Sequence, residues 1–284
     1  MKFLSCLVLF ILFSSQPSLC LEQDVNLVIN PKVAWQGKII AIKLLSAEGI
    51  SKVKGKFLNQ DFECYKIGNA FRGIVGVSIN QKPSHYDLKL NLIRDDGSTQ
   101  ELSKSVKVWS TKFPFSRFWL RPAKKRLMVP ELINQEWAQI EKALMVEEPV
   151  QRWKGRFALP VDGTISQGFG YHQIINGRRG GSHRGVDFEV PNGTEVRAPN
   201  QGKVVFVKRL KVFGGTMVLD HGQGIHTLYF HLSKIIARVG EDVDKGDIIA
   251  LSGDSGISSA PHLHWGLSVH NLRVDPLQWV KYEI

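Results

Sequence analysis

The segment APHLHWG, residues 260–266, places two histidines one residue apart, between a proline and a tryptophan. In a β-strand, residues two positions apart project from the same face, so His262 and His264 would point in one direction. Two imidazoles on one face suit a metal site, as two ligands or as one ligand and one catalytic group. An isolated His-x-His pair is a weak signal, and the rest of the chain has to decide between these uses and a structural one.

A second cluster lies in SHRGVDFEVP, residues 182–191, where His183 and Asp187 stand four positions apart. Together with His264 they provide two imidazoles and one carboxylate. This is the three-ligand set of a catalytic zinc site, which leaves a fourth position open for water. A magnesium site would require more oxygen ligands. Eight of the nine histidines of the chain lie in residues 156–284, which marks this region as the one that carries chemistry.

A zinc hydrolase also needs a base for the attacking water and a donor for the oxyanion. The chain contains no His-Glu-x-x-His motif, so no helical glutamate is offered as the base. His262 shares the face of His264, and His231 ends the strand-like run IHTLYFHL, residues 225–232. This histidine pair could do the work instead.

In this order and with these gaps, HRGVD (183–187), YFHL (229–232) and PHLHWG (261–266) resemble the lysostaphin-type zinc endopeptidases, also called LytM-domain peptidases. The resemblance covers nearly all of residues 156–284. It implies a compact antiparallel β-domain that cuts peptide bonds in bacterial peptidoglycan. The implied Zn²⁺ ligands are His183, Asp187 and His264, and the implied catalytic pair is His231 and His262.

The resemblance leaves open which histidine of the pair is the base. It also weakens around the cleft, where His172 stands in place of a common arginine and Gly266 in place of a common glutamate. These departures concern cleft shape and substrate choice rather than the metal ligands. We expect the cleft between loop 171–182 and the loop before His262, with Tyr171 and His172 contacting substrate.

The N-terminal residues have the layout of a signal peptide. One lysine precedes an apolar run, residues 3–13, that is too short to span a bilayer comfortably. We predict a signal peptide over residues 1–20 with cleavage after Cys20; a lipoprotein signal that lipidates Cys20 and an uncleaved anchor are the alternatives. The protein is therefore expected to be exported, to the periplasm or cell envelope or into the medium. Only Cys64 then remains, which excludes an internal disulfide.

We predict an all-β fold in three parts. Residues 21–111 read as short strands with a hairpin turn at 94–100, which indicates a small, immunoglobulin-like β-sandwich. Residues 112–155 are a basic linker with a helix that begins at Pro130. Residues 156–284 are dense in glycine and in strand candidates, as expected for the LytM-type antiparallel domain. The helix is expected to dock through Ile133, Trp137, Ile140 and Leu144, which share one face.

The net charge of +11 is concentrated outside residues 156–284, which carry only +2. A basic exported protein favours a polyanion such as the cell wall or lipid headgroups, and we expect no nucleic-acid partner. The predicted function is an exported zinc metalloendopeptidase, a monomer, that cleaves cross-links or stem peptides of peptidoglycan. The N-terminal module is expected to have a wall- or protein-binding role.

Two alternatives stand beside this prediction. One is a non-catalytic LytM-domain protein that regulates another wall hydrolase; the complete set of ligands and histidines argues against it. The other is an enzyme kept latent by the linker helix or the N-terminal module. The latent enzyme predicts that residues 156–284 alone cut faster than residues 21–284.

Overall fold

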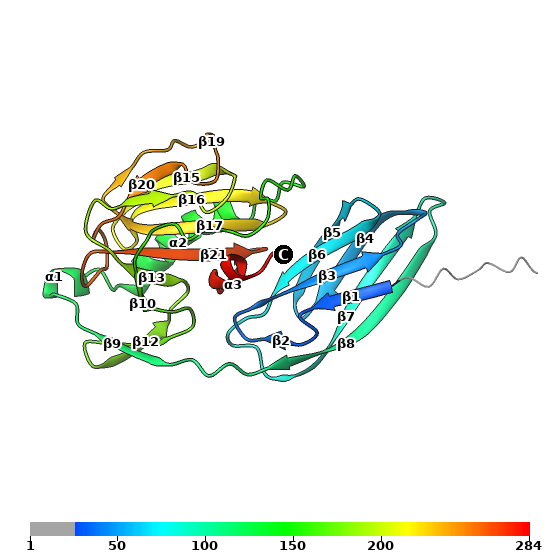
Figure 1. Ribbon diagram of the computed structural model, residues 1–284. Helices are drawn as coiled ribbons and strands as arrows, with labels where there is room; N and C mark the ends of the chain where they lie inside the picture. Colours follow the sequence, from blue (N-terminus) through cyan, green and yellow to red (C-terminus); the bar gives the residue numbers. More distant parts are fainter. Residues whose placement is uncertain (1–25) are drawn as a thin grey trace, which may run out of the picture.

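The computed structural model describes residues 26–284. The predicted signal peptide and the alternatives for Cys20 lie outside the described residues. The described chain is mostly β-structure, as predicted, and its two β-rich halves lie side by side (Figure 1). Within residues 26–284, no helix combines the length and the apolar character needed to cross a membrane.

The first half is a set of eight strands in the hydrogen-bonded order β1-β3-β6-β5-β4-β7-β8-β2, around one hydrophobic cluster. Leu88, Leu90 and Leu92 of β7 are fully buried while Lys89 and Asn91 between them are exposed, which is the period of two expected of a half-buried strand. The predicted hairpin joins β7 to β8, and the immunoglobulin-like sandwich remains a prediction. The bounds are β1 (Asn26–Asn30), β2 (Ala34–Trp35), β3 (Ile39–Leu45), β4 (Ile50–Phe57), β5 (Gln60–Ile67), β6 (Ala70–Gly76), β7 (Ser84–Arg94) and β8 (Thr99–Trp109).

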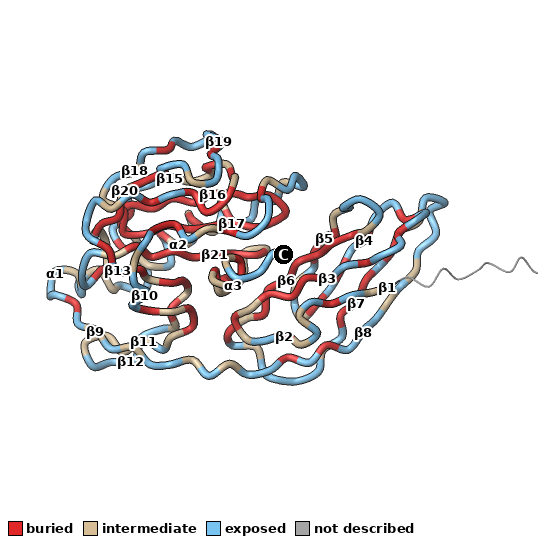
Figure 2. Tube along the Cα trace, in the orientation of Figure 1, coloured by how far each residue is buried: buried red, intermediate tan, exposed pale blue. Residues whose placement is uncertain are grey.

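The second half is built on a sheet in the order β10-β13-β21-β17-β16-β15-β19, with β22 paired to β21. Its strands β16 and β17 are buried along their whole length, as Figure 2 shows, because both faces of the sheet are covered. Two three-stranded sheets flank it, β12-β11-β9 and β14-β20-β18. The bounds are β10 (Thr164–Gln167), β11 (His172–Ile175), β12 (Arg178–Ser182), β13 (Val186–Glu189), β14 (Glu195–Arg197), β15 (Gly202–Leu210), β16 (Gly214–Gly222), β17 (Ile225–Leu232), β18 (Lys234–Ile235), β19 (Asp242–Val243), β20 (Ile248–Leu251), β21 (His262–Val269), β22 (Leu272–Val274) and α3 (Leu277–Lys281).

The segment between the halves contains β9 (Phe115–Phe118), α1 (Pro122–Lys125) and α2 (Pro130–Leu144). Helix α2 begins at the predicted proline, and its apolar face packs on β15, β16 and β17. Glu136 is buried in this contact, and its carboxylate accepts the backbone N–H groups of Lys211 and Val212 at 2.7 and 2.8 Å. Strand β9 pairs in parallel with β11. The segment is therefore fastened to the second half at two places.

The two halves share a hydrophobic cluster, in which Ile39 of β3 and Ile74 of β6 pack with Val274 and Trp279. The amide of Gln278 in α3 exchanges two hydrogen bonds with the backbone of Ile39, at 2.8 and 3.1 Å. This contact lies at the carboxyl end of β21 (Figure 1), whereas His262 and His264 lie at its amino end. The first half is thus docked away from the histidines.

A buried chain of hydrogen bonds stabilises the centre of the second half. The hydroxyl groups of Tyr229 and Thr227 lie 2.9 Å apart, and that of Thr227 lies 2.8 Å from Nε2 of His221. Nδ1 of His221 donates to the carbonyl oxygen of Gln201 at 2.7 Å, so Nε2 must accept from Thr227. Burial lowers the pKa of His221 to about 4, which keeps this imidazole neutral.

This neutrality makes the fold sensitive to acid. His221 takes up a proton near pH 6.5 in the unfolded chain but only near pH 4 in the folded one, so the free energy of unfolding falls as the pH falls through this window. For this group the loss is up to roughly 3 kcal/mol. We expect His221→Asn to be less stable than wild type near pH 7 but to lose less stability between about pH 6.5 and 4.5. Urea unfolding in a chelator-containing buffer measures this, and parallel pH profiles would contradict it.

Candidate metal centre

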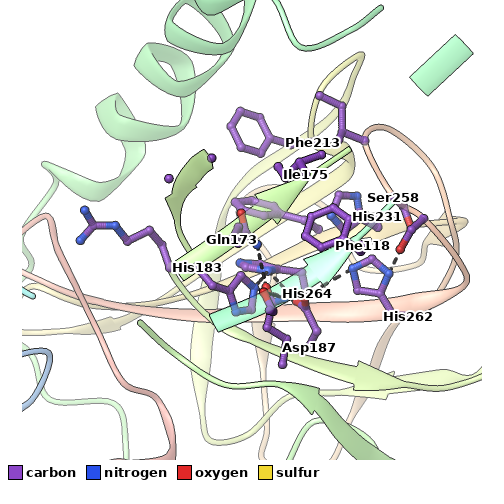
Figure 3. A pocket seen from close by; sticks show the side chains of 18 of the residues that line it. Phe118, Gln173, Ile175, His183, Asp187, Phe213, His231, Ser258, His262 and His264 are labelled. Carbon is purple, nitrogen blue, oxygen red and sulfur yellow. Dashed lines mark hydrogen bonds and ion pairs between the residues drawn. The ribbon is translucent and has the colours of Figure 1, made fainter. Parts of the chain in front are cut away.

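The pairing of β13 with β21 brings the first two predicted ligands together. Asp187 and His264 are direct partners in the antiparallel register, so their side chains leave the sheet from neighbouring positions on the same face. His183 precedes β13, and its ring reaches back to the same point (Figure 3). These are the three residues of the described chain whose ligand atoms converge in a metal-binding arrangement.

The donor atoms lie close together. Nε2 of His183, Oδ1 of Asp187 and Nδ1 of His264 are separated by 2.8 to 2.9 Å. Nδ1 of His183 is 2.9 Å from the carbonyl oxygen of Gly168 and donates to it, so in the neutral ring Nε2 presents a lone pair. That lone pair faces Asp187 Oδ1, a second acceptor. Two acceptors at this distance repel each other unless a cation lies between them, and the nitrogen and oxygen donors fit zinc.

Electrostatics keep this cluster in the protonation state that a metal ion requires. Burial alone would raise the pKa of Asp187, but the adjacent imidazoles of His183 and His264 hold it well below its usual range. Burial lowers the pKa of His264 to about 4, although the carboxylate of Asp187 acts in the opposite direction. The carboxylate is therefore ionised, and the His264 ring is neutral, at neutral pH.

The other two predicted histidines lie beside the metal ligands. The ring centroids of His231 and His262 are 4.7 Å apart, and that of His231 is 6.2 Å from that of His264. Nδ1 of His231 donates to the carbonyl oxygen of Ser255, and Nδ1 of His262 to that of Ala260, both at 2.8 Å. Both rings therefore present Nε2 as the free nitrogen. Burial, reinforced by the neighbouring imidazoles, holds the pKa of His231 well below its ordinary value.

The backbone of His231 adopts an unusual conformation, with a φ of 63° in the left-handed region. Non-glycine residues rarely adopt it, and when they do they concentrate at functional sites. Here it allows two consecutive residues, Phe230 and His231, to face the same cavity at the end of β17. Phe230 stacks on the ring of His264 with a centroid distance of 5.0 Å and an interplanar angle of 7°. The strained turn thus places one histidine and orients another.

These groups line a cavity of about 1200 Å³. It lies between the β11–β12 hairpin and the loop over residues 257–261, where the cleft was expected. The linker supplies a further wall: Phe118 of β9 and Ile133 and Trp137 of α2 all face the cavity. Figure 3 shows Phe118 near the histidines. The parallel pairing of β9 with β11 puts it there.

Tyr171 and His172 are not among the residues that line this cavity. Side chains alternate along β11, so Gln173 and Ile175 face the cavity while His172 turns outward and packs on Phe115, with ring centroids 5.2 Å apart. The β11–β12 hairpin itself borders the cavity, and contact of Tyr171 and His172 with substrate remains a prediction.

The comparisons with known proteins agree with this geometry. Residues 181–276 match Peptidase family M23. The chain is 40% identical over 124 residues to the glycyl-glycine endopeptidase ALE-1 of Staphylococcus capitis. The matched region covers 42% of this chain and 34% of that protein. It is 38% identical over 101 residues to the peptidoglycan DD-endopeptidase ShyA of Vibrio cholerae serotype O1. The matched region covers 36% of this chain and 24% of that protein.

A crystal structure described as a peptidase M23 from Pseudomonas aeruginosa extends the likeness beyond this domain. It matches with a TM-score of 0.66 and 26% identity over 88% of this chain and 95% of that one. Residues 181–276 of this chain thus form a Peptidase family M23 domain. The chain spans about a third or less of the two curated relatives named above.

Gly185 lies between two of the ligands in the chain, and a substitution there tests whether close packing against Gly185 positions the ring of His264. A Cβ there would lie 2.6 Å from Nε2 of His264 and 2.6 Å from the carbonyl oxygen of Trp265, so Gly185→Ala must displace the ring. We expect its zinc affinity to fall roughly tenfold to hundredfold, as for other changes that misorient a ligand. Competition with a chromophoric chelator measures the affinity.

Gly181→Ala is the matched control, because a Cβ at Gly181 meets no atom within 4 Å. It should bind zinc like wild type. Equal zinc affinity in the wild type and both variants would show that the ring of His264 is not positioned by its contact with Gly185.

Proposed function

We propose that this protein is an exported zinc metalloendopeptidase that cleaves peptide cross-links or stem peptides of bacterial peptidoglycan. The observation that carries the proposal is the convergence of three metal-donor atoms next to two further histidines, in one large cavity. The relatives named as a glycyl-glycine endopeptidase and a peptidoglycan DD-endopeptidase support the substrate class.

In this proposal His183, Asp187 and His264 hold one zinc ion. Bound zinc supplies Lewis acidity, polarising a carbonyl and making water more acidic. Nε2 of His231, neutral and unprotonated, accepts the proton of the attacking water. His262 takes the complementary role: because its Nδ1 donates to Ala260, it steadies the oxyanion from Nε2, which must then carry a proton as well.

The non-catalytic alternative requires that a protein keep all five groups in these orientations without using them. The latent alternative meets a different difficulty. Helix α2 buries apolar surface on the second half, and both α2 and β9 form part of the cavity wall. Their removal would therefore uncover this apolar surface and take away part of the cleft wall. We therefore favour an active enzyme in which the linker shapes the cleft.

The direct test is a digest of intact peptidoglycan by zinc-loaded protein lacking residues 1–20, with the fragments identified by mass spectrometry. We expect release of peptide-bond cleavage products. His264→Ala should abolish them together with zinc binding. His231→Ala should bind zinc normally but cut roughly a hundredfold to ten-thousandfold more slowly, the usual contribution of a general base.

His85→Ala is the matched control, since His85 is exposed on β7 of the other half. It should cut like wild type. A zinc-loaded wild-type protein that releases no fragment would contradict the proposal and favour the regulatory alternative. Faster cutting by residues 156–284 alone would favour latency.

A further inference from the structure

The cleft floor contains a side chain that comes from another strand. His262, His264 and residue 266 project from the same face of β21, and residue 266 is a glycine. An ideal Cβ at Gly266 would collide with Nη2 of Arg273. The guanidinium of Arg273, from the neighbouring strand β22, therefore occupies the space that a side chain at 266 would fill.

This places a cation on the cleft floor next to the metal ligands. Positions 264 and 266 lie roughly 7 Å apart along the strand. The guanidinium of Arg273, which fills the space at position 266, is therefore displaced from His264 by about this distance, on the side away from His262. Nη2 of Arg273 donates to the carbonyl oxygen of Arg184, which follows the ligand His183 in the chain. Both arginines line the cavity.

Arg273 is buried without an acidic partner. Its side chain is enclosed, with 6% of the residue exposed, and lies over the rings of Trp137 and Phe230 at 5.5 and 5.9 Å. Within residues 26–284, no carboxylate forms an ion pair with it, and its Nε has no hydrogen-bond partner. The charged side chain that influences Arg273 most is a second cation, Arg184. Burial, together with repulsion from Arg184, lowers the pKa of Arg273 to about 9.

A buried guanidinium without a counter-charge is costly, and its planar fork is suited to a carboxylate. We propose that Arg273 forms a carboxylate-binding subsite of the cleft, which selects peptides with a free carboxylate within about two residues of the cleaved bond. The inference rests on the function proposed above. It favours cross-links between acid-bearing stem peptides over uncharged glycine bridges, whose residues carry no side-chain carboxylate to pair with this cation.

The alternative is that Arg273 only packs between Trp137 and Phe230. Arg273→Met separates the two roles, because methionine retains an apolar stem in the same space and removes the charge. A packing role predicts that the change affects charged and uncharged ligands alike. A carboxylate subsite predicts that it affects only the charged one.

The probes are blocked synthetic peptides that contain the bond identified in the peptidoglycan digest, or a D-alanyl–diaminopimelate bond if the digest yields none. They are made in pairs, with a carboxylate or a carboxamide on the residue within two positions before or after that bond. Calorimetry on zinc-loaded His231→Ala measures their dissociation constants without turnover. We expect one acid to bind at least about tenfold more tightly than its amide.

Adding Arg273→Met should remove this preference and leave amide binding within about threefold. Arg178→Met is the matched control; Arg178 is exposed on β12 and does not line the cavity, so the preference should persist. Melting temperature and zinc stoichiometry confirm that each variant is folded.

Equal binding of acid and amide by the parent protein overturns the subsite, as does an equal loss of both in Arg273→Met or no binding of any peptide. Cleavage of acid and amide peptides at equal rates by the wild type would overturn the subsite alone and leave the peptidase intact. Acid-selective binding without any cleavage would support the subsite and contradict the proposed function.

Discussion

The site depends on the register of one pair of strands. β13 and β21 run antiparallel with Asp187 opposite His264, and a slip of one residue would turn either side chain to the other face of the sheet. The flanking apolar residues oppose such a slip, because Phe188 and Leu263 are fully buried on the opposite face and are themselves paired. Core packing thus sets the position of the ligands.

Given this register, the remaining polar groups are arranged to leave lone pairs free. Backbone carbonyls accept the Nδ1 protons of His183, His231 and His262, so each of these rings presents Nε2 to the site. His264 instead presents Nδ1. A cluster of acceptors without enough protons to share is unstable alone and well suited to a cation. The guanidinium of Arg273 lies between aromatic rings and has no carboxylate partner among the described residues. Such low-polarity surroundings favour the binding of an anion to it.

The sequence predicted most of what lies on long strands. The run HLHWGLSV, residues 262–269, forms β21 with His262 and His264 on one face, and helix α2 begins at Pro130 as expected. These features follow local periodicity, which a single sequence carries. Spacing and family resemblance together brought His183 and Asp187 to His264, although the residues lie far apart in the chain.

The features that were missed depend on contacts between distant segments. The parallel pairing of β9 with β11 has no local signal, so the place of Phe118 in the cleft wall could not be predicted. His172 lies on the outward face of β11, where its ring packs on Phe115 of β9. Arg273 reaches the floor of the cleft only because residue 266 lacks a side chain, and the sequence marked Gly266 as unusual without indicating what replaces it.

Zinc K-edge X-ray absorption of the reconstituted protein tests the central claim most directly, because it reports the ligands of the metal without a substrate. We predict one zinc per chain with a four-coordinate shell of nitrogen and oxygen at about 2.0–2.1 Å, including two imidazoles. In His264→Ala one imidazole should be lost. A sulfur shell from Cys64, a six-oxygen shell, or a spectrum unchanged in His264→Ala would contradict the account.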